Sequence, residues 1–328
     1  MQQRGASIEM QGSNAQQQGA SIAFSHVSVT YADGAEHVTA CQDVSFAVGS
    51  GQSVALIGPS GCGKSTTLHM AAGLLAPSEG SVLVNDAPVN QPRQATAFIP
   101  QDLGLLPWKT ALQNAALGLI VRKTPRTEAF ERARAALAQV DMVGFVQSYP
   151  KELSGGMRQR LALARALAMD ADLLLMDEPL SAIDALLRES LQDTLLELWQ
   201  KRRHTQMLVT HSIEEAVYLG QRIVVFSARP GSIVADIENP RMGTPDWRDS
   251  SGFSEKCLEV RRALASGSNA LDGDLQNDSK LSGSSQDDGN TLDGDWQNVP
   301  QRGGNSQDDG GAFDCDSQGI DSQNGGTQ

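Results

Sequence analysis

The chain has 328 residues, of which 40% are hydrophobic and 20% are charged, and its formal net charge is −13 at pH 7. The negative charge is concentrated at one end, because residues 266–328 carry twelve Asp, no Glu and only two basic side chains. The rest of the chain is close to neutral and has no strongly basic region of the kind that binds nucleic acid. We therefore expect no nucleic acid among its partners.

The cysteine content excludes a disulfide framework, and the hydropathy excludes a membrane-spanning helix. The four cysteines, at positions 41, 62, 257 and 315, form no C-x-x-C pair, which excludes a disulfide framework and suits a reducing cytoplasm. The longest uncharged apolar run, 115–121, is far shorter than the ~18 residues of a membrane-spanning helix. The first residues also lack the apolar segment of a signal peptide. If the protein works at a membrane, we expect another chain to span it.

Both ends of the sequence are polar and repetitive. Residues 2–8 recur almost unchanged at 16–22, and residues 271–277 recur at 292–298. A fixed period can indicate a solenoid, and Asp-Gly repeats can bind calcium weakly, but residues 266–328 contain only seven Leu, Ile, Val and Phe, too few for a stacked core. We predict a disordered polar extension at 1–20, a folded domain at 21–245, a short helical segment at 246–265 and a disordered acidic repeat tail at 266–328.

The central part of the chain alternates between strand and helix patterns. Alternating or continuous apolar runs predict strands at 27–30, 44–48, 53–57, 82–84, 97–99, 173–176, 207–209 and 223–226. Helices are predicted at 182–202 and 212–219, and an Ala/Leu-rich helical stretch at about 102–170. This order predicts an α/β fold with a mainly parallel sheet, a small antiparallel β subdomain and an inserted α-helical subdomain.

A glycine-rich loop follows the strand predicted at 53–57. It reads Gly58-Pro59-Ser60-Gly61-Cys62-Gly63-Lys64-Ser65-Thr66 and matches G-x-x-x-x-G-K-[ST]. Glycines let backbone N–H groups turn toward phosphate oxygens, and the N-terminus of the following helix adds partial positive charge. We predict that this loop binds a nucleoside triphosphate, with Lys64 at the β- and γ-phosphates and Ser65 among the ligands of Mg2+. The predicted core is thus that of a P-loop NTPase.

Two adjacent acids, Asp177 and Glu178, end the apolar run at 173–176. At the end of a buried strand, Asp177 can hold Mg2+, and Glu178 can accept a proton from the attacking water or orient it. Adjacent acids can instead cap a helix. The phosphate loop in the same domain favours the metal and water interpretation.

A second possible anion site begins at Ser154-Gly155-Gly156-Met157-Arg158-Gln159-Arg160, which precedes a helical pattern rich in Ala and Leu. Ser154 is a typical N-cap residue, and the two glycines leave N–H groups exposed at a helix start. Considered alone, this segment also suits an ordinary capped helix.

Over about residues 22–235, these motifs in this order resemble the ATP-binding-cassette family. The resemblance implies that Ser154, Gly155, Gly156 and Gln159 belong to the signature motif, which contacts ATP held by the partner subunit. It assigns four further positions: Tyr31 as the aromatic that stacks on adenine, Gln101 as the glutamine that touches Mg2+ and water, Asp184 in the loop that crosses the dimer, and His211 as the switch histidine at the γ-phosphate.

The resemblance also implies a mechanism and partners. Two copies would meet head to tail around two ATP molecules, and closure followed by hydrolysis would drive separate transmembrane permease subunits. Three segments resemble the nitrate/sulfonate/taurine importer ATPases: residues 105–114, 211–219 and 226–231. We therefore expect an ATPase subunit of an importer for a small anionic, sulfonate- or nitrate-like solute that a solute-binding protein delivers, peripheral at the cytoplasmic face of the plasma membrane. The alternative is a soluble ATP-binding-cassette ATPase with a regulatory or repair role and no transport.

Overall fold

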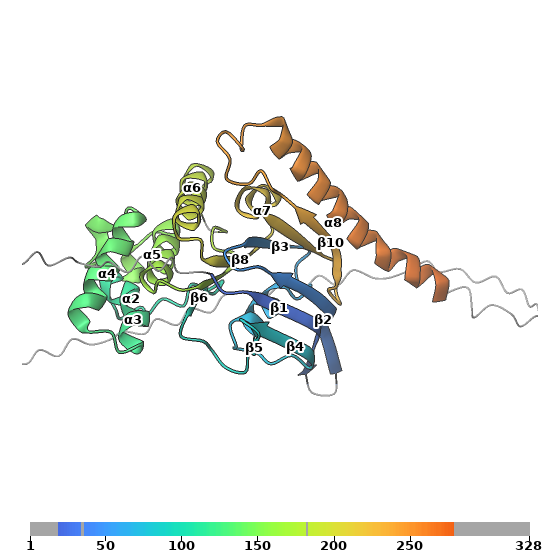
Figure 1. Cartoon of the computed structure of the whole chain (residues 1–328), viewed down its shortest axis with the longest axis horizontal. Coiled ribbons are helices and arrows are strands. Elements are labelled where there is room, and N and C mark those ends of the chain that lie inside the picture. The colour runs from blue at the N-terminus through green and yellow to red at the C-terminus, as the bar shows by residue number, and fades with distance from the viewer. Residues whose placement is uncertain (1–18, 34–35, 182, 279–328) are drawn as a thin grey trace, which may run out of the picture. The chain divides into compact units, whose positions relative to one another are not determined.

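The computed structural model describes residues 19–33, 36–181 and 183–278 (Figure 1). The chain divides into two units, 1–282 and 283–328, and every described residue belongs to the first. The polar extension and the acidic repeat tail that the sequence predicts lie largely outside the described residues.

The first sheet is antiparallel, as predicted. It contains β1 (Ile22–Asp33), β2 (Glu36–Val48), β4 (Glu79–Val84) and β5 (Ala87–Pro88) in the order β2-β1-β4-β5. Both β1 and β2 are longer than the strands that we predict. Phe24 and Phe46 lie opposite each other in this hairpin, with ring centroids 4.5 Å apart, which fixes its apolar face.

The second sheet is mainly parallel. It contains β3 (Ser53–Ile57), β6 (Thr96–Ile99), β7 (Leu173–Asp177), β8 (Thr205–Thr210), β9 (Arg222–Phe226) and β10 (Ile233–Glu238). The order is β10-β9-β3-β8-β7-β6, and only the pairing of β10 with β9 is antiparallel. Every residue of β3, β7 and β8 is buried, because both faces of this sheet are covered.

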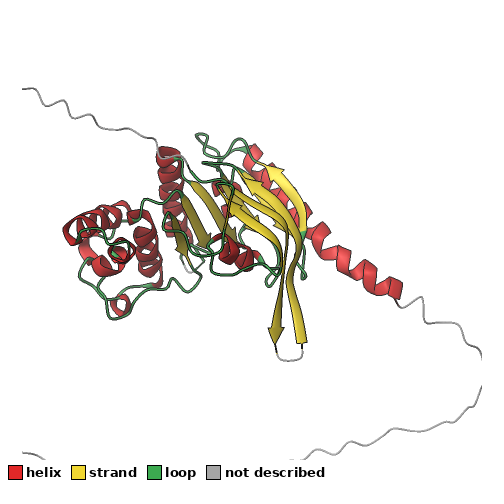
Figure 2. Cartoon of the chain, turned by 60° about the horizontal axis from the view of Figure 1, so that its bottom comes forward, coloured by secondary structure: helices red, strands yellow, loops and turns green. Residues whose placement is uncertain are grey.

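The inserted helical subdomain lies between β6 and β7. Its helices are α2 (Ala111–Ala115), α3 (Leu117–Val121), α4 (Arg126–Gln139) and α5 (Gly155–Ala168). They gather to one side of the strands in two views (Figures 1 and 2). Helices α4 and α5 bury alanines and leucines, among them Ala133, Leu137 and Leu161.

The described part of the chain has four more α-helices: α1 (Lys64–Ala71), α6 (Ala185–Arg202), α7 (Ile213–Leu219) and α8 (Ser251–Asp278). Helix α8 extends well beyond residue 265, so residues 266–278 are helical and do not belong to the predicted tail. Its apolar residues recur at helical spacing and pack on the core: Phe253, Cys257, Val260 and Leu264. No helix in the described part of the chain is long and apolar enough to cross a membrane.

Two hydrophobic clusters fill the faces of the parallel sheet. Neighbouring residues of β3 alternate between them: Ala55 and Ile57 belong to one cluster, Val54 and Leu56 to the other. Ala20 is also buried in the second cluster, and its carbonyl accepts a hydrogen bond from Thr205. The folded domain therefore begins at least one residue earlier than predicted.

Candidate nucleotide site

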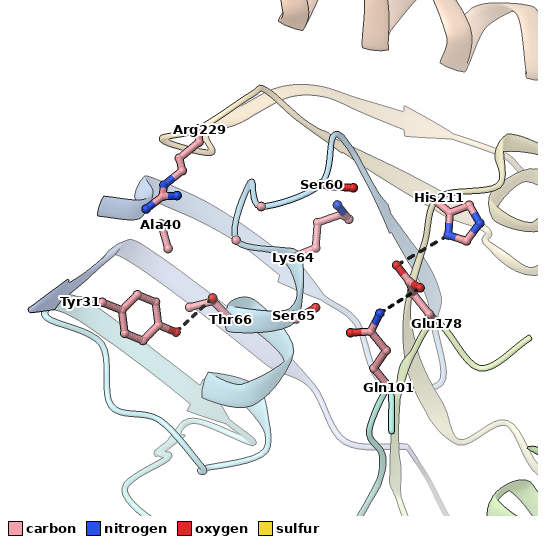
Figure 3. Close-up of a pocket in the computed structure, with 12 residues that line it drawn as sticks. Tyr31, Ala40, Ser60, Lys64, Ser65, Thr66, Gln101, Glu178, His211 and Arg229 are labelled. Atoms are coloured by element: carbon pink, nitrogen blue, oxygen red, sulfur yellow. Dashed lines mark hydrogen bonds and ion pairs between the residues drawn. The ribbon is translucent and has the colours of Figure 1, made fainter. Parts of the chain in front are cut away.

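The site forms where the carboxyl ends of three parallel strands meet. Ile57 of β3 pairs with Thr210 of β8, and Asp177 of β7 pairs with Val209 of β8. The phosphate loop, Glu178 and His211 follow these strand ends directly, so they border one cleft of about 460 Å³. The cleft is lined by Tyr31, Ala40, Ser60, Gly61, Gly63, Lys64, Ser65, Thr66, Gln101, Glu178, His211 and Arg229 (Figure 3).

The phosphate loop keeps its shape through glycine geometry and a buried lysine. Gly63 precedes α1 with φ of 90°, and a Cβ there would lie 2.9 Å from the Cβ of Cys41. The ammonium of Lys64 donates hydrogen bonds to the carbonyls of Gly58 at 2.9 Å and Pro59 at 2.7 Å. Gly58, Pro59 and Cys62 are the three predicted loop residues that do not line the cleft.

Cys62 lies behind the loop rather than in the cleft. Its side chain is fully buried, and burial is the main cause that raises the pKa of its thiol. The thiol therefore stays protonated at neutral pH and acts as a small packing residue.

Oxygen ligands suited to Mg2+ converge beside the loop. The Ser65 hydroxyl donates a hydrogen bond to Oδ1 of Asp177 at 3.0 Å. These two residues and Gln101 line one cavity of about 470 Å³, so the three predicted metal ligands share a space. Burial raises the pKa of Asp177, and the hydrogen bond from Ser65 opposes that rise. Hydroxyl, carboxylate and amide oxygens fit a hard cation.

Gln101, Glu178 and His211 form a connected group at one end of the cleft. The Nε2 of Gln101 donates to Oε2 of Glu178 at 3.3 Å, and Nδ1 of His211 lies 3.6 Å from Oε1 (Figure 3). Glu178 has φ of 49°, in the left-handed region that non-glycine residues rarely adopt. Its amide is held by the Val209 carbonyl at 3.0 Å. Such strain is typical of positions whose side-chain direction matters.

Tyr31 lies on the other side of the phosphate loop from this group. Its hydroxyl is 3.2 Å from the Thr66 hydroxyl, and the residue is 42% exposed. The hydrogen bond fixes the ring at the cleft and leaves part of it accessible to a planar ligand (Figure 3).

The predicted signature and dimer-loop residues are not in this cleft. Ser154 caps α5, with Oγ accepting from the Met157 amide at 3.3 Å, and Asp184 caps α6, with Oδ1 accepting from the Leu187 amide at 3.0 Å. Gly156 lies against α6, where an added Cβ would approach Leu187 to 3.0 Å. Gly155 opens α5 and Gln159 is buried on it. Within one chain, Ser154 and Asp184 stabilise helix starts, and none of these residues lines the nucleotide cleft.

Two cleft residues, Ala40 and Arg229, were not among the predicted site residues. Arg229 belongs to residues 226–231, whose resemblance to importer ATPases implies no role in the site. The sequence gives no local signal for its position, because the loop after β9 reaches the cleft through long-range backbone contacts to β2.

The chain is also similar to known proteins in sequence and fold. The ABC transporter family model matches residues 41–181. The taurine import ATP-binding protein TauB of Burkholderia pseudomallei (strain 1710b) is 46% identical over 216 residues, which cover 66% of this chain and 83% of that protein. TauB of Chromobacterium violaceum is 44% identical over 221 residues, 67% of this chain and 84% of that protein.

A solved structure has the same fold. It is a dimeric structure of a post-hydrolysis state of the ATP-binding cassette MJ0796 bound to ADP and Pi. It is 31% identical, has a TM-score of 0.61, and covers 66% of this chain and 98% of its own.

The fold and the cleft define an ATPase cassette built on a P-loop NTPase core. More narrowly, the chain belongs to the ABC transporter ATP-binding family, in its nitrate/sulfonate/taurine importer-like group. These findings confirm the predicted fold class, family and ATPase activity.

Proposed function

We propose that the protein is the ATP-hydrolysing subunit of an importer that works as a pair of copies and drives a separate permease. The observation that carries this proposal is the connected group of Gln101, Glu178 and His211 at one end of a cleft whose floor is the phosphate loop. This end can hold water at a γ-phosphate. Relatives whose names describe taurine import support the importer role.

The nucleotide lies along the cleft. Backbone amides of residues 58–66 surround the phosphates, and Lys64 exchanges its two carbonyl partners for phosphate oxygens. The adenine stacks on the exposed face of Tyr31, because every base offers a π-face to an aromatic ring.

Ser65, Asp177 and Gln101 are the residues that would hold Mg2+. The ion supplies positive charge against the phosphate oxygens. Asp177 serves this role in its ionised form, and Ser65 already positions its carboxylate through their hydrogen bond.

Glu178 accepts a proton from the attacking water or orients it. Gln101 and His211 restrict its carboxylate from two sides, one at each oxygen. His211 is largely exposed, so it can also face the γ-phosphate.

The second copy completes each site. The start of α5 offers Ser154, Gly155, Gly156 and Gln159 to the nucleotide of the partner subunit, and Asp184 lies in the loop that crosses between copies. A two-fold axis makes both sites equivalent. The dimeric cassette structure bound to ADP and Pi supports this arrangement.

The remaining partners follow from the importer role. The dimer binds transmembrane permease subunits at the cytoplasmic face of the plasma membrane, and a solute-binding protein delivers a small sulfonate- or nitrate-like solute. Closure on ATP and reopening after hydrolysis would switch the permease between its two orientations.

The test is reconstitution of the full chain with its candidate permease in lipid vesicles. We expect ATP hydrolysis to increase when the permease and a solute-loaded binding protein are present, and taurine or nitrate to accumulate. The Glu178→Gln variant serves as the inactive control. Hydrolysis that ignores the permease would contradict the importer proposal and favour a soluble ATPase.

A further inference from the structure

Arg229 borders the nucleotide cleft but belongs to none of the groups proposed to bind phosphate, Mg2+ or water. It lies in the loop of residues 227–232 that joins β9 to β10. In Figure 3, Arg229, Ala40 and Tyr31 lie on one side of the phosphate loop, and Gln101, Glu178 and His211 lie on the other.

The loop that carries Arg229 is fixed to its surroundings. The Gly231 amide donates to the Ala40 carbonyl at 3.0 Å, and the Gln42 amide donates to the Gly231 carbonyl at 2.9 Å. Gly231 also packs directly on the phosphate loop, since an added Cβ would lie 1.8 Å from the Cys62 carbonyl oxygen. Strand β2, this loop and the phosphate loop therefore form one packed unit, which presents Arg229 at a defined place.

The guanidinium of Arg229 keeps donors available at the cleft. Its Nε donates to the Thr39 carbonyl at 3.3 Å, which orients the group. Among the residues that the structure describes, no carboxylate forms an ion pair with Arg229. A guanidinium has five N–H donors in a planar fork, so the two Nη groups can serve a ligand.

The order of groups along the cleft identifies the part of the ligand that Arg229 meets. With phosphates over the loop and the γ-phosphate toward Glu178, the nucleoside lies toward Tyr31. We propose that Arg229 binds the nucleoside, donating hydrogen bonds from Nη to oxygen or nitrogen acceptors of the ribose or base that stacks on Tyr31. This rests on the nucleotide orientation given under Proposed function, but not on any permease.

The test compares ATP with inorganic tripolyphosphate, which has the phosphates but no nucleoside. Affinities of the full-length wild type, Arg229→Gln and Arg229→Lys are measured by calorimetry in EDTA, so that ATP is bound but not hydrolysed, and Arg134→Gln is the control for loss of an exposed arginine. We expect Arg229→Gln to bind ATP about 10-fold more weakly, the value of one charge-assisted hydrogen bond, with unchanged tripolyphosphate affinity. Arg229→Lys should lose less ATP affinity than Arg229→Gln, and Arg134→Gln should bind ATP as the wild type does.

Each other outcome has a distinct meaning. Unchanged ATP affinity in Arg229→Gln overturns the proposal. Equal losses for ATP and tripolyphosphate also overturn it, because Arg229 would then act on the phosphates or on loop structure. Retained tripolyphosphate binding reports a folded site in each variant. If the wild type bound neither probe, the nucleotide site itself would be wrong, and failure to couple to a permease would leave this result untouched.

Discussion

The Ser65 hydroxyl and the Asp177 carboxylate are hydrogen-bonded at 3.0 Å although they lie 112 positions apart in the sequence. This contact joins the first turn of α1 to the end of β7. It holds the carboxylate beside the phosphate loop, in a buried place where its charge is disfavoured. We infer that the fold accepts an unfavourable charge here because a cation uses it.

Asp177→Asn tests whether the buried charge of Asp177 lowers stability and is needed for metal binding. Because the pKa of Asp177 is raised, the folded protein binds more protons than the unfolded chain between the ordinary Asp pKa and the raised value. Stability therefore falls as pH rises through that window. At neutral pH without Mg2+ or nucleotide, we expect Asp177→Asn to melt a few degrees above the wild type.

At acid pH, the difference in melting temperature between Asp177→Asn and the wild type should disappear. The variant should also lose its response to Mg2+. Below the ordinary Asp pKa both proteins carry a neutral group, so the gap in melting temperature should close. Mg2+-dependent ATP hydrolysis should fall by roughly 100-fold or more, in line with loss of a metal ligand. A variant that melts below the wild type at neutral pH would contradict the assignment of a buried, disfavoured charge.

Lys64→Ala should weaken nucleotide binding with little effect on the fold. The ammonium donates to the carbonyls of Gly58 and Pro59, and a phosphate would replace them with a stronger, charge-assisted contact. We expect ATP affinity to fall by roughly 10- to 100-fold, as for a hydrogen bond between charged groups. Lys201→Ala is the matched control, because Lys201 is exposed and forms an ion pair with Glu197 on the surface of α6. Comparable losses in both variants would refute a specific role for Lys64.

Gly231→Ala should displace the phosphate loop, because Gly231 packs on its backbone. A Cβ there would lie 1.8 Å from the Cys62 carbonyl oxygen, and neither backbone can yield without moving the phosphate loop. We expect a loss of about 1–3 kcal/mol in unfolding free energy, the usual cost of overpacking, together with weaker ATP binding. Gly144→Ala is the control, since a Cβ at Gly144 meets nothing within 4 Å. Denaturant unfolding of both variants checks the difference, and equal stabilities would show that the loop is free to move.

Glu178→Gln should separate binding from hydrolysis. The amide keeps the size of the carboxylate but cannot accept a proton, so turnover should fall by about 10²- to 10⁴-fold while ATP affinity stays near that of the wild type. Glu197→Gln, an exposed change on α6, should hydrolyse ATP normally. Single-turnover rates with labelled ATP measure both. Intact hydrolysis in Glu178→Gln would mean that another group activates the water.

The phosphate loop, Asp177 and Glu178 could be predicted from sequence because each lies at the end of a buried strand or directly after it. Chain connectivity then places these residues at the same edge of a parallel sheet. The parallel order itself follows from alternating strands and helices. These strands and site residues can be predicted from short sequence patterns: the spacing of apolar residues and the glycines and acids next to them.

Arg229 and strand β10 depend on contacts that no local pattern records. Arg229 reaches the cleft because Gly231 docks on β2 and on Cys62. Strand β10 is only partly buried at the sheet edge, so its apolar alternation is weak. Ser154 and Asp184 each cap a helix within one chain. Their proposed role at ATP needs a second chain.

Pairing of two copies around ATP is tested most directly by the molar mass in solution of Glu178→Gln, measured by light scattering with and without ATP and Mg2+. We expect one chain without nucleotide and two with it, because slow hydrolysis traps the closed pair. Adding Ser154→Asp keeps an N-cap for α5 but places negative charge at the partner's phosphates. The double variant should bind ATP and stay a single chain. A Glu178→Gln chain that remains single with saturating ATP, or a double variant that pairs equally well, would contradict a shared site between two copies.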